Sequence, residues 1–87
     1  MREQIQQRIR EHIVETWLNG DGRGFDDNVD LIRSGILDSF TTLALASFLD
    51  TAFQIEVDAV DINSQTFQNV NAVTDMVLEK LANPGEP

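Results

Sequence analysis

The apolar residues near the N-terminus have the spacing of a helix. They recur every fourth position among arginine, glutamine and glutamate, and they are Ile5, Ile9, Ile13 and Trp17. This spacing places them on one stripe of an amphipathic helix, which we predict over residues 3–18. The Asn19-Gly20 pair that follows is typical of a helix end, because glycine adopts positive φ at little cost.

The same periodicity predicts two further helices. One covers residues 39–53, with Asp38 in front of it as the N-cap. The other covers about 70–82, with Asn69 as its N-cap and a proline beyond its end. Asparagine and aspartate favour these positions because their side-chain oxygens accept hydrogen bonds from the free N–H groups of the first turn.

The connections between these helices are long. Residues 20–37 are rich in glycine and aspartate at first and carry several apolar anchors later. Residues 54–68 read as a connection with a short helical turn near 62–65. We therefore predict an all-α fold, a small four-helix bundle of three main helices and one short helix with a long first loop. One domain would cover residues 1–82, and residues 83–87 would be a disordered tail.

The helix predicted over residues 39–53 is apolar on two faces. One arc of about 120° has the width of a core-facing stripe, and it carries Thr42, Leu45, Ala46, Leu49, Ala52 and Phe53. The other side carries Phe40, Leu43, Ala44, Ser47, Phe48 and Thr51. Asp50 is the one charged residue in the helix. An exposed apolar face of this kind marks an interaction site, unless loop residues such as Phe25 cover it.

Charge narrows the choice of partners. The chain of 87 residues has 6 basic and 15 acidic side chains, a net charge of −9. Residues 21–61 hold nine of the acids against only Arg23 and Arg33. Such a field repels nucleic acid and anionic membranes, and it favours partners with basic docking surfaces.

Other features limit the chemistry and the compartment. The chain has no cysteine, so disulfides, thiolate metal sites and redox chemistry on the protein are excluded. The N-terminal residues lack the apolar segment of a signal peptide, and no run approaches the roughly 18 apolar residues of a membrane span. These features lead us to expect a cytoplasmic protein.

Ser39 stands at the start of the second predicted helix. Taken alone, a serine there is usually only a helix cap. Its surroundings, LIRSGILDSF over residues 31–40, resemble the acyl and peptidyl carrier protein family, whose signature is Asp-Ser followed by a large apolar residue, usually Leu, at a helix start. Phe40 takes the place of that Leu here. The resemblance extends to FQIEV over residues 53–57 and TFQNV over residues 66–70, and so covers nearly the whole chain.

The resemblance implies a non-catalytic carrier modified at Ser39. In this family a phosphopantetheinyl transferase moves 4′-phosphopantetheine from coenzyme A to the serine, and the terminal thiol holds an acyl or aminoacyl cargo as a thioester. The phosphodiester suits this position, because a first helical turn offers free N–H groups and the positive end of the helix dipole. Asp38, directly before the serine, would belong to the same cofactor-binding site.

The resemblance implies that the partners are the transferase, a cargo-loading enzyme and downstream biosynthetic enzymes. The chain itself would act as a monomer. The outer face of the helix after Ser39 is the expected partner-binding surface, with positions Phe40, Leu43, Ala44, Ser47 and Phe48.

The cargo is less closely defined. Carriers of primary fatty-acid synthesis bear several acids along the helix after the serine, whereas Ala44 and Ser47 stand where acids are expected here. This departure favours an aminoacyl group or a specialised-metabolite acyl chain, as in polyketide or nonribosomal peptide metabolism. A carrier of fatty-acid synthesis remains an alternative.

A helical interaction or dimerisation module is the other alternative. It would work unmodified, with Ser39 only capping its helix and the Phe40/Phe48 face binding a partner. Catalysis by the chain itself has little support, because the single histidine, His12, lies in the middle of the first predicted helix, where a plain surface or edge role is expected.

A calcium loop is also excluded. Asp26, Asn28 and Asp30 imitate the beginning of such a loop. Leu31 and Leu37, however, occupy the positions where the loop needs glycine and glutamate. No metal site is therefore predicted.

Overall fold

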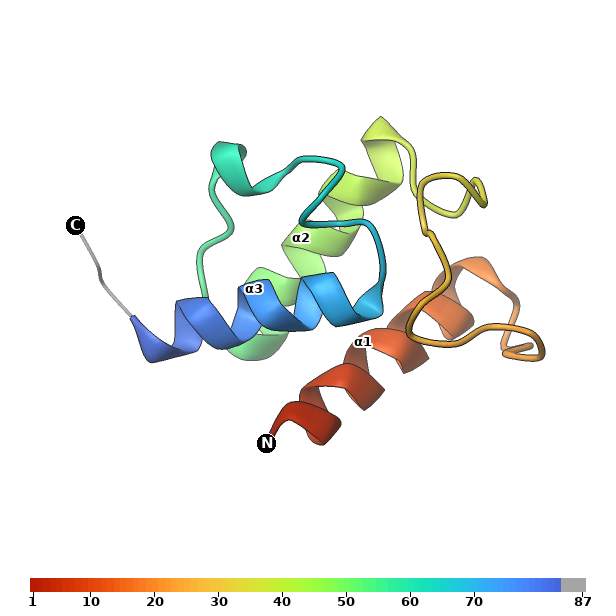
Figure 1. The fold of residues 1–87 in the computed structure, drawn as a ribbon, viewed down its shortest axis with the longest axis horizontal. Helices are drawn as coiled ribbons and strands as arrows, with labels where there is room; N and C mark the ends of the chain where they lie inside the picture. Colours follow the sequence, from red (N-terminus) through yellow and green to blue (C-terminus); the bar gives the residue numbers. More distant parts are fainter. Residues whose placement is uncertain (84–87) are drawn as a thin grey trace.

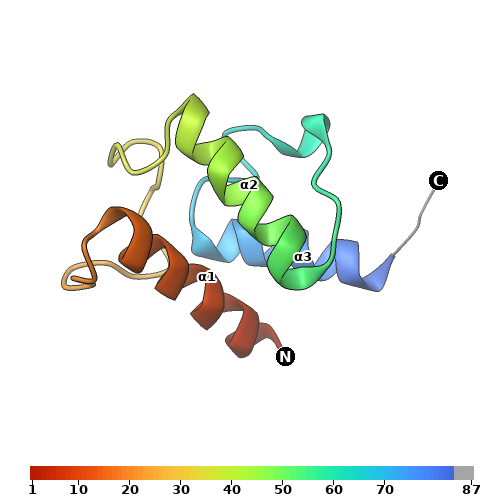
Figure 2. The ribbon, with the colours of Figure 1, turned by 180° about the vertical axis from the view of Figure 1, so that it is seen from behind.

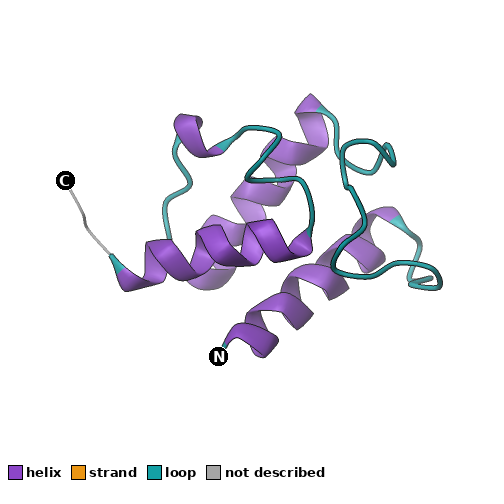
Figure 3. Cartoon of the chain, in the orientation of Figure 1, coloured by secondary structure: helices purple, strands orange, loops and turns teal. Residues whose placement is uncertain are grey.

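The computed structural model describes residues 1–83, and within them three α-helices are joined by two long connections (Figure 1). The helices are α1 over Arg2–Trp17, α2 over Ser39–Phe53 and α3 over Val70–Ala82, with a 3-10 helix, η1, over Ala59–Asp61. No strand occurs in this part of the chain (Figure 3). The prediction of a small all-α bundle is confirmed. The predicted disordered tail, apart from Asn83, lies outside the described residues.

The helix boundaries follow the local signals in the sequence. Helix α2 has the predicted bounds, and α1 begins and ends one residue earlier than predicted. Asn19 and Gly20 have φ values of 55° and 78°, so the chain leaves α1 through the left-handed region as the Asn-Gly pair predicts. Asp38 and Asn69 are the N-caps of α2 and α3, also as predicted.

The short helix of the second connection lies earlier than predicted. The sequence pattern predicted a helical turn near residues 62–65, and a turn does lie at residues 63–67, where the Phe67 N–H donates to the Asn63 carbonyl at 3.1 Å. The 3-10 helix itself, η1, covers Ala59–Asp61. Two hydrogen bonds close this turn: Asp61 N–H donates to the Asp58 carbonyl at 2.9 Å, and Asp58 N–H donates to the Asp61 carboxylate at 2.9 Å. Lys80 of α3 then pairs with the carboxylates of Asp61 at 2.7 Å and Asp58 at 3.2 Å. These contacts, which apolar periodicity does not reveal, fix η1 on α3.

The core lies where the three helices meet. Helix α1 packs mainly against α3, and α2 crosses α3 (Figure 2). The connections also contribute, because Leu31, Leu37 and Phe67 are buried as completely as the helix residues. On α2 the buried residues are Leu45, Ala46 and Leu49, all from the predicted core-facing arc.

The first loop is held on its inner side. The Leu31 amide donates to the Gln68 carbonyl at 2.7 Å, and the Leu37 amide donates to the Leu31 carbonyl at 2.8 Å. Arg10 forms two hydrogen bonds to the Asp27 carboxylate, at 2.7 and 2.9 Å. The buried ends of residues 31–37 thus join the core, and the loop leaves the outer face of α2 at Phe40 uncovered.

No helix within residues 1–83 is long and apolar enough to cross a lipid bilayer. The longest, α1, has 16 residues and carries charged side chains along much of its surface.

Leu49→Ala should destabilise the fold by about 2 to 5 kcal/mol, because it deletes a fully buried side chain and leaves a cavity. Thr51→Ala is the matched control in the same helix, at an exposed position where little change is expected. Urea unfolding followed by circular dichroism measures both. Equal midpoints would contradict the observed orientation of α2.

Candidate functional site

Ser39 is the first residue of α2 and is exposed to solvent. It follows Leu37, which is 2% exposed and anchors the end of the loop in the core. The serine therefore stands two residues beyond a fixed point, where the first loop enters α2 (Figure 1). Among residues 1–83, no hydrogen-bond partner is found for its hydroxyl.

Asp38 and Thr41 cap the helix. The Asp38 carboxylate accepts hydrogen bonds from the N–H groups of Phe40 and Thr41, both at 2.9 Å. In return, the Thr41 hydroxyl accepts from the Asp38 N–H at 2.8 Å. This is a reciprocal capping box, with threonine in the place often taken by glutamate. The cap of α2 is therefore Asp38, and the interpretation of Ser39 as the cap is wrong.

The capping box changes the electrostatics expected for an attached phosphodiester. The backbone N–H and the hydroxyl of Thr41 both donate to Asp38 and lower the pKa of its carboxyl, so Asp38 is ionised at neutral pH. Two of the free N–H groups of the first turn are thus already bound to a carboxylate. Of the N–H groups at the start of α2, only that of Ser39 has no acceptor among the described residues. The start of the helix therefore has fewer free donors for an anion than the sequence suggested.

The outer face of α2 divides into two halves. Near Ser39, Phe40 is 77% exposed and Leu43 is 57% exposed. Ala44 and Ser47 are exposed beside them. One turn further on, Phe48 is half-buried and packs against the core. Of the five predicted partner-binding positions, the structure leaves four open and partly covers Phe48.

His12 of α1 is what covers Phe48. Its ring stacks on the Phe48 ring with centroids 3.7 Å apart and planes within 9° of parallel. Trp17 meets the His12 ring edge-on, and Phe53 meets Phe48 edge-on. Arg8 lies 5.2 Å from the centre of the Phe53 ring. An aromatic row therefore joins α1 to the second half of α2, and His12 has a packing role that the sequence did not predict.

Asp50, the one charged residue of α2, is also engaged within the molecule. Its carboxylate accepts a hydrogen bond from the Val57 N–H at 2.8 Å and so secures the chain after the helix. Asp50 therefore contributes structure rather than a free charge to the outer face.

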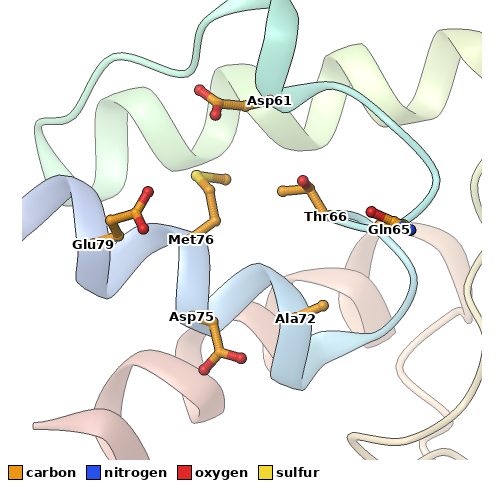
Figure 4. A pocket seen from close by; sticks show the side chains of 7 residues that line it. All are labelled: Asp61, Gln65, Thr66, Ala72, Asp75, Met76 and Glu79. Carbon is orange, nitrogen blue, oxygen red and sulfur yellow. The ribbon is translucent and has the colours of Figure 1, made fainter.

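A pocket of about 320 Å³ lies between α3 and the chain from η1 to Thr66 (Figure 4). Two of its carboxylates are already paired, Asp61 with Lys80 at 2.7 Å and Asp75 with Arg2 at 2.6 Å. None of the predicted site residues lines it. Within residues 1–83 no group of three or more acidic or histidine side chains is arranged to hold a metal ion.

Thr41 is the site residue that the sequence interpretation missed. The available signal was a hydroxyl side chain three residues after an aspartate N-cap, which is the spacing of a capping box. The missed role of His12 had no such signal, because its partner Phe48 lies on another helix.

A small helical domain with an exposed, unpaired serine at the start of its second helix has the architecture of a carrier protein. No family model matches the chain. Proteins named D-alanyl carrier protein from two strains of Lactobacillus delbrueckii subsp. bulgaricus are each 32% identical to it, over 79% of this chain and 89% of their own length. The chain belongs to the acyl and peptidyl carrier protein family.

Acidification should weaken the contact between α1 and α2. Partial burial lowers the pKa of His12 from its usual 6.5, so the folded state binds a proton at this ring less readily than the unfolded chain does. The contribution of His12 to the free energy of unfolding is therefore greatest above pH 6.5. It declines as the pH falls below 6.5 and stops declining below the folded-state pKa. Urea midpoints should therefore drop between pH 7.5 and 5.5.

His12→Phe is the matched control, because it keeps a stacked ring and removes the proton. Other titrating groups act in both proteins, so the difference between their pH profiles isolates His12. Parallel profiles, or a His12 midpoint at or above 6.5 by nuclear magnetic resonance, would contradict the role of burial.

Proposed function

We propose that Ser39 is the attachment point of 4′-phosphopantetheine. The observation that carries this proposal is the free, exposed Ser39 hydroxyl beside a helix cap supplied by Asp38 and Thr41, in a chain of the carrier family. The residues present fit the group: the hydroxyl is accessible, and no described side chain covers it. When attached, phosphopantetheine supplies a flexible arm whose thiol holds the cargo as a thioester.

The modification is a phosphoryl-type transfer to Ser39. The Ser39 oxygen forms a bond to the phosphorus on the pantetheine side of coenzyme A while the pyrophosphate P–O bond breaks. Adenosine 3′,5′-bisphosphate leaves, and the hydroxyl proton passes to a base of the phosphopantetheinyl transferase. The chain has only to present the oxygen, and catalysis belongs to its partner enzymes.

We infer an aminoacyl cargo. The names of the two relatives support it, and D-alanine is the first amino acid to test. The outer face of α2, which carries no free acid near Ser39, supports it over a carrier of fatty-acid synthesis. The second possible cargo is a specialised-metabolite acyl chain of a polyketide or nonribosomal peptide pathway. The lack of free acids on the outer face of α2 supports this cargo too.

We propose that partners dock on the exposed half of the outer face, formed by Phe40, Leu43, Ala44 and Ser47. Its apolar surface supplies contact, while the net charge of −9 steers partners with basic surfaces during the encounter. The transferase, the loading enzyme and downstream enzymes would bind here in turn. Residues 1–82 would form the carrier domain, acting as a monomer.

Incubation with coenzyme A and a phosphopantetheinyl transferase should add one phosphopantetheine to the wild type and none to Ser39→Ala, as read by intact mass. The variant should stay folded, with a stability change within about 0.5 kcal/mol, because the substitution is on the surface and the helix cap remains. Modification of Ser39→Ala would overturn the assignment.

Thiol titration gives an independent check of the modification and of its cargo. The chain has no cysteine, so the denatured apo-protein should contain no reactive thiol and the modified protein one equivalent. Loading with an amino acid should remove that equivalent. A loaded form that keeps its full free thiol would contradict the thioester.

Phe40→Ala should raise the off-rate of the transferase or loading enzyme about tenfold or more, the size expected when an interface anchor is removed, with little effect on folding. Phe48→Ala is the matched variant. It should cost about 1 to 3 kcal/mol of stability, because it removes the ring that stacks on His12. An unchanged off-rate for Phe40→Ala would argue against docking at this half of the face.

A further inference from the structure

The Thr41 hydroxyl joins three parts of the chain at the start of α2. It accepts a hydrogen bond from the Asp38 N–H at 2.8 Å. Its own proton faces two acceptors at the same distance of 3.1 Å, the Ile36 carbonyl and the Asp38 carboxylate. One hydroxyl therefore links the end of the first loop, the cap residue and the first turn of the helix.

Ser39 lies inside the closed segment that these contacts define. On one side Leu37 is buried in the core, and on the other the Thr41 hydroxyl reaches back to Ile36. The three residues between them, Asp38, Ser39 and Phe40, are exposed and do not pack into the core. The direction of the Ser39 side chain therefore depends on backbone that Thr41 holds.

The same contacts explain why the serine stays free. Serine at a helix start commonly bonds to the backbone of the first turn. Here the N–H groups of Phe40 and Thr41 are already bound to Asp38, whose own N–H is bound to Thr41. These N–H groups have their acceptors without Ser39, so the Ser39 hydroxyl remains available as a nucleophile.

We propose that Thr41 is a positioning residue for the modification of Ser39: its hydroxyl fixes the junction of loop and helix so that the Ser39 oxygen is held for attack on coenzyme A. This inference rests on the proposed function. Thr41 has no role in the chemistry itself and acts through the backbone of residues 36–39.

Loss of the Thr41 hydroxyl should affect modification more than folding. In Thr41→Val the Asp38 carboxylate keeps its bonds to two backbone N–H groups, so α2 keeps its cap. The Asp38 N–H and the Ile36 carbonyl lose their partner and turn to water. The helix then persists, while Ser39 samples a wider range of positions relative to a bound enzyme.

The test is steady-state kinetics of a phosphopantetheinyl transferase with coenzyme A and the full chain as substrate. Thr41→Val should lower kcat by roughly tenfold to a hundredfold, the range expected when a reacting atom is displaced by up to about 1 Å. KM for the chain should change little, because the docking residues Phe40 and Leu43 are untouched. Thr41→Ser, which restores the hydroxyl, should recover most of the rate.

Thr42→Val is the matched control. It makes the same chemical change one residue later in the same turn, at a threonine whose hydroxyl has no hydrogen-bond partner among the described residues. It should be modified at the wild-type rate. Amide hydrogen exchange supplies a readout that does not depend on modification: exchange of the Asp38 N–H should be faster in Thr41→Val and unchanged in Thr42→Val.

The outcomes separate this inference from the proposed function. Failure of the transferase to modify the wild type would overturn both. Normal modification of the wild type, with equal kcat for Thr41→Val and Thr42→Val, would overturn the positioning role alone. A loss of rate in Thr41→Val that appears wholly in KM, or that Thr41→Ser does not restore, would overturn it as well.

Discussion

The fold is constrained by the need to bury loop residues in its core. Three short helices supply too little apolar surface for a core, since a chain of this size buries only about 60 to 70% of its unfolded surface. Leu31, Leu37 and Phe67 come from the connections and are nonetheless fully or almost fully buried. The Leu31 amide also bonds to the Gln68 carbonyl, so the two connections fix each other.

This constraint determines how Ser39 is presented. The loop between α1 and α2, residues 18–38, is long enough that the start of α2 would ordinarily be free to move. Because Leu37 is part of the core, that freedom ends two residues before the serine. The Asp38–Thr41 capping box then continues the fixed backbone into the helix. The candidate site is therefore an exposed residue on a well-anchored backbone, which suits the proposed modification by another enzyme.

Much of the fold, including the position of Ser39 at the start of α2, followed from the sequence because the signals were local. The stripe of apolar residues defined α1, and Asp38 and Asn69 marked the starts of α2 and α3. The position of η1 did not follow, since it depends on Lys80, which lies about twenty residues further along the chain. Such contacts between distant residues have no periodicity from which they can be recognised.

The role of Phe48 was hidden for a related reason. The α2 periodicity placed it correctly on the outer side of the helix, but only the packing of α1 decides that His12 covers it. Asp50 likewise reads as an exposed charge until its bond to the Val57 N–H is seen. In both cases the sequence gives the direction of a side chain and the tertiary structure gives its partner.

The proposed docking face lies at the Ser39 end of α2, because the exposed half of the outer face is at that end. Phe40 follows Ser39 immediately and Leu43 is one turn further, so the exposed apolar surface begins beside the serine. Further along the same side, Phe48 is covered by His12 of α1. A partner that buries the exposed half must therefore bring its own surface against the start of α2. In the proposed docking mode, the contact with Phe40 and Leu43 would also bring the enzyme beside Ser39.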